Sequence, residues 1–108
     1  MKTSGLLHPT EIVASPDYVQ QAVFAAAVGQ AFDVPAGAHY CSFSPSFGID
    51  FWVRYGSTAA SIPTTSSTGS STNAELNPSA RNVGSTAATT GISIISATTG
   101  YCTISWWV

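Results

Sequence analysis

Apolar and polar residues alternate along much of this chain, and the alternation predicts β-strands. Residues 50–55 read DFWVRY, which places Phe51, Val53 and Tyr55 on one face of an extended segment. Residues 101–108 read YCTISWWV and alternate in the same way. The residues that share one face of this second segment are Cys102, Ile104, Trp106 and Val108. A period of two residues is typical of strands. Further strands are expected at residues 11–14, 22–25, 27–34, 38–43 and 91–96.

Turn-forming residues separate these segments. The expected turns are Pro35-Ala36-Gly37, Ser44-Pro45-Ser46, Tyr55-Gly56, Asn77-Pro78 and Thr98-Thr99-Gly100. Short strands with closely spaced turns predict an all-β, single-domain β-sandwich or jelly-roll-like fold over residues 11–108. An extended N-terminal arm is expected at residues 1–10. Residues 63–72 are almost entirely Ser, Thr and Gly and are expected to form a surface loop.

One segment fits two structures. Ser15 could cap a helix that begins at Pro16, and Val19, Val23 and Phe24 fit a helical face about as well as a strand. We favour a turn that leads into a strand.

Charge is scarce in this sequence. Three basic and five acidic residues make 7% of the 108 residues, whereas soluble domains carry about 25%. No charged residue occurs in positions 82–108. A chain with so little charge is expected to cover much of its surface with partners, as a subunit of an assembly does.

The same scarcity excludes several functions. The three cations Lys2, Arg54 and Arg81 are too few and too scattered to neutralise a run of phosphates, so nucleic acid is not expected as a partner.

No apolar run approaches the roughly 20 residues of a membrane span, so no membrane contact is expected. The N-terminal residues lack the apolar centre of a signal peptide. The expected location is the cytoplasm or a particle assembled there.

Cys41 and Cys102 are the only cysteines. A disulfide between them would close a loop of about 60 residues and contribute about 4 kcal/mol in the chain-entropy model. The alternative is two buried thiols that pack as small apolar side chains. We favour the thiols because nothing in the sequence indicates an oxidising compartment.

The residues needed for catalysis or metal binding do not fall into recognisable patterns. No Gly-x-Ser-x-Gly turn, phosphate-binding loop or Cys-x-x-Cys pair is present. His8 lies in the expected arm and His39 on an expected strand, which favours structural roles for both. The sequence therefore predicts no enzyme, no catalytic residue, no cofactor and no metal ion.

The tryptophans are more informative. Trp106 and Trp107 are adjacent, so a strand must direct them to opposite faces, and Trp52 likewise opposes Phe51 and Val53. An outward indole has three interpretations: it is covered within the monomer, it anchors a protein interface, or it stacks on a sugar ring.

Four segments resemble a group of small virion proteins of tailed bacteriophages. They are AFDVPAGA at 31–38, FWVRY at 51–55, AELNPSAR at 74–81 and ISIIS at 92–96. The group has a similar VPAGA turn, a DFYVR-like strand, an ELNPAAR loop and a closing ISLI strand pair, and the resemblance covers residues 22–108. This chain departs from the pattern in its longer Ser/Thr loop at 63–72 and its Trp106-Trp107 ending. The resemblance implies a capsid decoration (cement) protein.

We therefore expect a virion structural protein, assembled in the bacterial host cytoplasm, that binds the major capsid protein. A homo-oligomer, either a dimer or a trimer, is expected. The alternative is a head-fibre, spike or tail-associated β domain that binds host-surface glycans. The residues expected to contact partners are Leu6, Leu7, Trp52, Arg54 and Trp107.

Overall fold

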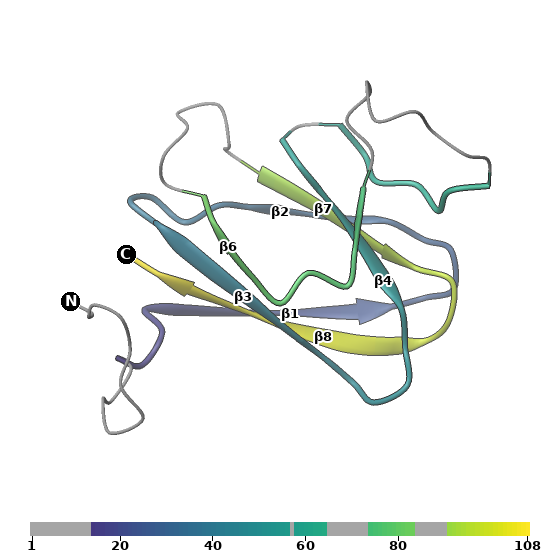
Figure 1. The fold of residues 1–108 in the computed structure, drawn as a ribbon, viewed down its shortest axis with the longest axis horizontal. Coiled ribbons are helices and arrows are strands. Elements are labelled where there is room, and N and C mark those ends of the chain that lie inside the picture. Colours follow the sequence, from purple (N-terminus) through teal and green to yellow (C-terminus); the bar gives the residue numbers. More distant parts are fainter. Residues whose placement is uncertain (1–13, 57, 65–73, 84–90) are drawn as a thin grey trace.

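A computed structural model describes residues 14–56, 58–64, 74–83 and 91–108. Within these ranges the chain forms antiparallel β-strands and no helix (Figure 1). The strands are β1 (Tyr18–Phe24), β2 (Gln30–Asp33), β3 (Tyr40–Pro45), β4 (Phe51–Tyr55), β5 (Glu75–Leu76), β6 (Ala80–Asn82), β7 (Gly91–Ser96) and β8 (Gly100–Trp107). The all-β prediction is confirmed for the described residues.

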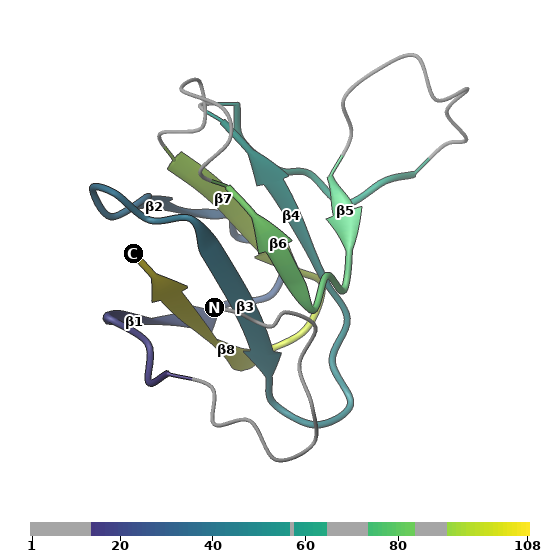
Figure 2. The ribbon, with the colours of Figure 1, turned by 60° about the vertical axis from the view of Figure 1, so that its left-hand side comes forward.

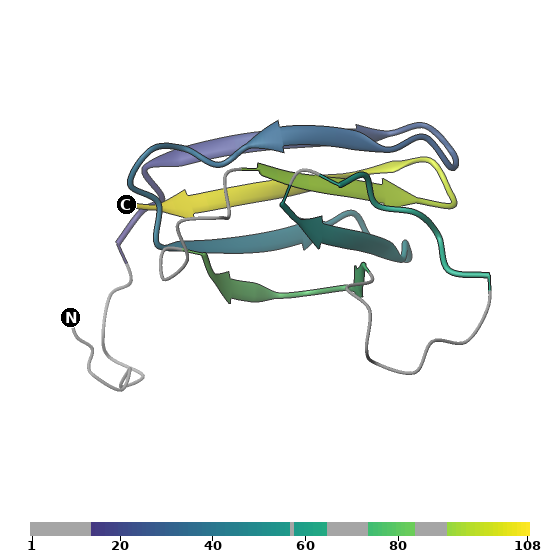
Figure 3. The same ribbon diagram turned by 90° about the horizontal axis from the view of Figure 1, so that it is seen from above.

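The strands form two four-stranded sheets. The first sheet has the order β1-β8-β3-β6 and the second has the order β2-β7-β4-β5. The chain passes from one sheet to the other at every connection except the one between β4 and β5. Seen from above, the strands of both sheets run along the same long axis (Figure 3). Figure 2 shows the short strand β6 beside β3 and the short strand β5 beside β4.

Side chains from both sheets meet in one core. The Phe51 ring of the second sheet lies 6.5 Å from the Phe24 ring and 5.9 Å from the Phe43 ring, measured between centroids. Both of those rings belong to the first sheet. The largest fully buried side chains are Trp106, Phe51, Ile92, Ile94, Ile104, Val53, Cys41, Cys102 and Ser96. Their spacing of two along each strand explains why the apolar alternation predicted the strands.

Most predicted strands are present with shifted ends. The strands predicted near residues 50–55, 91–96 and 101–108 match β4, β7 and β8 closely. β1 begins at Tyr18, four residues before the predicted start, and the preceding segment from Ser15 to Asp17 is not helical, as we favoured. The strand predicted at 11–14 is not found at Ala14, and its other residues lie outside the described ranges.

The expected turn at Ser44-Pro45-Ser46 is wrong, because β3 continues to Pro45 and the chain turns at Phe47-Gly48. The N–H of Phe43 donates to the Ser79 carbonyl on the β6 side of β3. Pro45 follows Phe43 by two residues on the strand, so a backbone N–H at Pro45 would point to the same side of β3. The β6 ladder ends at Ser42, so no ladder hydrogen bond is lost at Pro45.

Two short strands escaped prediction. β5 and β6 flank the expected turn at Asn77-Pro78, but they have only two and three residues, too few for alternation to show. Val108 was predicted to share a face with the buried Cys102, Ile104 and Trp106, but it is 58% exposed, because it follows the last paired residue of β8. The arm at 1–10 and residues 65–72 of the expected loop lie outside the described residues.

Candidate functional site

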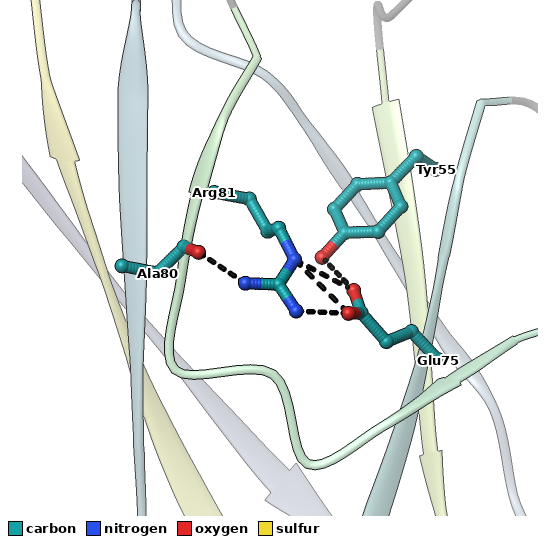
Figure 4. Close-up of polar contacts among 4 residues, drawn as sticks. All are labelled: Tyr55, Glu75, Ala80 and Arg81. Carbon is teal, nitrogen blue, oxygen red and sulfur yellow. Dashed lines mark hydrogen bonds and ion pairs between the residues drawn. The ribbon is translucent and has the colours of Figure 1, made fainter.

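The two sheets are joined at one side by a cluster of polar side chains. Glu75 on β5 accepts hydrogen bonds from Nε of Arg81 on β6, at 3.0 Å to each carboxylate oxygen. The Arg81 Nη2 atom also donates to Glu75 Oε2, and the Tyr55 hydroxyl of β4 donates to Oε1 at 3.1 Å (Figure 4). The guanidinium hydrogen bonds hold the pKa of Glu75 below its usual value. Burial, followed by the nearby Glu75 charge, raises the pKa of Tyr55. Because every group has a partner within the chain, this cluster is a brace between sheets.

Asn77 makes a second connection beside this brace. Its backbone N–H donates to the Phe51 carbonyl, and its Oδ1 accepts from the Phe51 N–H at 2.9 Å. Its Nδ2 donates to Asp50 Oδ1 at 2.8 Å. The residue has a φ of 49°, a left-handed conformation that Asn tolerates better than most residues. The AELNPSAR segment therefore carries side chains that fix the β5–β6 connection to β4.

The two thiols are buried in the core. Cys41 and Cys102 are free and fully buried in the core. Cys102 lies opposite Pro45, four residues along β3 from Cys41, which separates them by roughly 13 Å along the strand. A disulfide needs Cα atoms within about 7 Å, so the geometry supports reduced thiols. Burial raises the pKa of each thiol to about 11, so both stay protonated at neutral pH.

The outer face of the second sheet is partly covered by the chain itself. Residues 58–62 cross it, and the buried Ala60 donates its N–H to the Ser93 hydroxyl at 2.9 Å. Beside this segment lies an open hollow with a volume of about 560 Å³, bordered by Gly29, Ala31, Asp33 and Ala59. Its lining offers neither an aromatic ring facing outward nor a cluster of titratable groups. Among the described residues, no group of three or more His, Cys, Asp or Glu could hold a metal ion.

In the described strands, the outer face of the first sheet carries no charged side chain. The residues that point outward from it are Val19, Gln21, Val23, Tyr40, Ser42, Ser44, Ala80, Asn82, Tyr101, Thr103, Ser105 and Trp107. Val19, Val23, Tyr40 and Tyr101 are each more than half exposed. An uncharged face with exposed valines and tyrosines resembles the surface of a protein that meets partners.

Phe47 is the most exposed large apolar residue of the described chain. It lies at the turn between β3 and β4, and its side chain is wholly exposed, at 104% of the reference area. Gly48, with a φ of 83°, allows this tight turn. The preceding residue, Ser46, exchanges backbone and side-chain hydrogen bonds with Tyr101 of β8. Tyr101 in turn lies opposite the exposed Val23 of β1 in the strand pairing. We call Val23, Phe47 and Tyr101 the tip patch; it lies at the end where the β1–β2 and β7–β8 turns also lie (Figure 1).

The structure separates the residues that we expected to contact partners. Trp52 and Arg54 lie on the outer face of the second sheet, where Trp52 is opposite Ile95 and Leu76 and both side chains are half-buried. Trp107 lies on the outer face of the other sheet. Leu6 and Leu7 lie outside the described residues. No single surface therefore unites these five residues.

Trp107 is covered by a segment that we did not anticipate. Its indole N–H donates to the Ala14 carbonyl at 2.7 Å, and its side chain is half-buried. The neighbouring Val108 N–H donates to Asp17 Oδ2 at 2.7 Å. The residues just before β1 thus cover part of the indole within the monomer, which favours the first of the three interpretations of an outward tryptophan.

Sequence reasoning missed Phe47. A signal was available, since an aromatic residue between Pro45 and Gly48 stands inside a turn-forming segment. An apolar residue in such a place has no strand partner and no core position, which indicates exposure.

Comparison of the chain with protein-family models, curated proteins and solved structures found no match. No helix among the described residues is long and apolar enough to cross a membrane.

Proposed function

We propose that this chain is a structural protein of a tailed-bacteriophage virion, a capsid decoration protein that binds the major capsid protein and stabilises the shell. The observation that carries the proposal is the tip patch, where Phe47 is wholly exposed in a chain with only 7% charged residues. A lone domain gains nothing from an exposed phenylalanine, whereas an aromatic side chain that enters a partner's pocket contributes strongly to binding.

The topology supports the same proposal. The orders β1-β8-β3-β6 and β2-β7-β4-β5 are typical of a jelly-roll β-sandwich, and we assign the fold to that type. Jelly rolls are frequent in viral capsid and lectin domains. The fold alone does not specify a function, so the proposal depends on the exposed surface and on the resemblance of the four sequence segments to virion proteins.

The stabilising mechanism is mass action. A protein that binds the assembled shell and not the free capsid subunits shifts the equilibrium toward the shell. Many copies on one particle act together, so modest affinity per copy suffices. In this mechanism the brace and the Asn77 connection hold the two sheets rigid, and the tip patch enters the capsid surface.

The copy number on particles tests the proposal directly. We expect quantitative mass spectrometry of virions from the encoding phage to find this chain at a ratio close to that of the major capsid protein. A few copies per particle would instead support the alternative, a fibre, spike or tail domain that binds host glycans. Absence from purified virions would refute both.

The role of Phe47 is tested by Phe47→Ser. Because the side chain is wholly exposed, the change should leave the melting temperature of the isolated protein unchanged. It should weaken binding to shells that lack this protein by about 2 kcal/mol, roughly thirtyfold in Kd. Val108→Ser, which alters an exposed apolar residue at the other end of the molecule, is the matched control and should bind normally. Equal binding by both variants would remove Phe47 from the interface.

A further inference from the structure

β1 is an unprotected edge strand. Among the described residues, it lies at the end of the first sheet with β8 as its only neighbour in the ladder. The other sheet edges are β6, β2 and β5, which have three, four and two residues, whereas β1 has seven. Natural edges are protected by short length, by charged side chains or by proline. β1 reads YVQQAVF and has none of these protections.

The hydrogen-bond pattern shows which backbone groups face the free edge. The Ser46 N–H donates to the Tyr101 carbonyl at 2.7 Å, so odd-numbered residues of β8 bond toward β3 and even-numbered ones toward β1. Ala22 lies opposite Cys102 in the register. Even-numbered residues of β1 therefore bond to β8, and the odd-numbered ones direct their N–H and C=O groups outward. The hydrogen bond to the Val23 carbonyl supports this outward direction. The carbonyl accepts from the Gln30 side-chain amide at 2.5 Å and not from a backbone group of β8.

The sequence of β1 is nearly palindromic about Gln21. Counting outward from this residue, Val19 matches Val23 and Tyr18 matches Phe24, while Gln20 is matched by the small Ala22. An antiparallel strand of identical sequence, related by a two-fold axis through Gln21, places each of these residues opposite its match. Gln21 is also one of the residues whose backbone groups face the edge, so it can exchange two hydrogen bonds with itself across the axis.

The exposed side chains fit the same arrangement. Val19 and Val23 are 54% and 70% exposed and point to the outer face of the sheet on either side of Gln21. Across the axis each Val19 meets Val23 of the second copy, so that apolar pairs cover each other, and the two uncharged glutamines meet at the centre. No charged residue of β1 opposes the contact.

We propose that two copies of this chain pair through β1, antiparallel about a two-fold axis at Gln21, and join their first sheets into one continuous sheet. The Gln30 side chain does not prevent this, because the Val23 carbonyl has a second lone pair that can accept the amide of Val19 from the other copy. This interface is isologous, as a two-fold dimer requires. It stands independently of the proposed function, since it concerns the purified protein alone.

A charge-swap experiment tests the interface. Sedimentation velocity should show the unmodified protein moving, as its concentration rises, to twice the 11.1 kDa mass of one chain. Gln21→Lys and Gln21→Glu each place like charges opposite each other on the axis and should weaken self-association at least about tenfold. An equimolar mixture of the two variants should restore association to within a few-fold of the unmodified protein. Ser42→Lys adds the same charge on the same face, two strands from the edge, and should leave the dimer intact.

Amide hydrogen exchange on the unmodified protein gives a second readout that needs no variant. The outward amides of Val19, Gln21 and Val23 should exchange quickly in dilute protein and become protected as the dimer forms. The proposal is overturned if the protein stays monomeric at every concentration, if the mixed variants do not associate, or if a dimer forms while these amides remain fast. It is also overturned if Ser42→Lys disrupts the dimer as strongly as Gln21→Lys.

Discussion

The few charged side chains of the described chain mostly hold strands together. Glu75 and Arg81 connect the edges of the two sheets, Asp50 accepts from Asn77, and Asp17 accepts the Val108 N–H. These groups consequently contribute little to the solubility of the outer faces. A sequence poor in charge therefore leaves broad uncharged surface even where its charges are exposed.

Glu75→Gln should weaken the brace in a pH-dependent way. The pKa of Glu75 is lowered in the folded protein, so its contribution to stability is present above the unfolded pKa of about 4.3 and is lost as pH falls through the lower folded pKa. The variant should therefore have a lower melting temperature than the unmodified protein at pH 7. The difference should shrink as the pH is lowered below about 4.

Thermal melts between pH 7 and pH 2 measure this difference. Asp33→Asn is a suitable control, because it removes another exposed carboxylate that lies outside the brace. A Glu75→Gln effect that is constant across the pH range would show that the carboxylate charge plays no part in the brace.

At the scale of the strands, β8 organises the first sheet. It pairs with β1 on one side and β3 on the other, and its alternation sends Trp106 into the core and Trp107 outward. Trp106 is fully buried, and its indole N–H donates to Gln20 Oε1 at 2.9 Å. The predicted register of this strand is confirmed for Cys102, Ile104 and Trp106.

The two tryptophans should respond differently to truncation. Trp106→Ala leaves a large cavity and removes the hydrogen bond to Gln20 Oε1, and should lower the free energy of unfolding by about 3–5 kcal/mol. Trp107→Ala removes a half-buried ring and one hydrogen bond to Ala14, and should lower it by about 1 kcal/mol. Urea denaturation of both variants measures the two losses. A larger loss for Trp107→Ala would contradict this assignment of inner and outer faces.

At the scale of the whole molecule, the two outer faces differ. The second sheet is crossed by residues 58–62, which bury Ala60 against it. Within the described part of the chain, only the segment before β1 lies against the first sheet, along its Trp107 side, and no described residue covers the rest of its face or pairs with its β1 edge. This asymmetry is why the dimer is proposed on the first sheet. Val23 of the tip patch is covered in that dimer, whereas Phe47 and Tyr101, at the end of the same sheet, remain available for a different partner.

Part of the candidate site could be found from the sequence. The alternation located β4, β7 and β8, and the scarcity of charge indicated extensive uncharged surface. The roles of Glu75 and Asn77 could not be found in this way, because their partners Tyr55 and Phe51 lie 20 and 26 residues away and meet them only when the strands pack. Arg81 takes its role from Glu75 and was missed with it. Phe47 was missed because alternation describes strands and not turns.

The sequence alone determined the strand class and the inner face of each long strand, because a period of two follows from the geometry of a single extended chain. It also determined that charge could not cover the surface. Only the tertiary structure decided which strands are edges, because edge position depends on the order of strands within each sheet. That order makes β1 an edge among the described strands, and it results from contacts between residues that are distant along the chain.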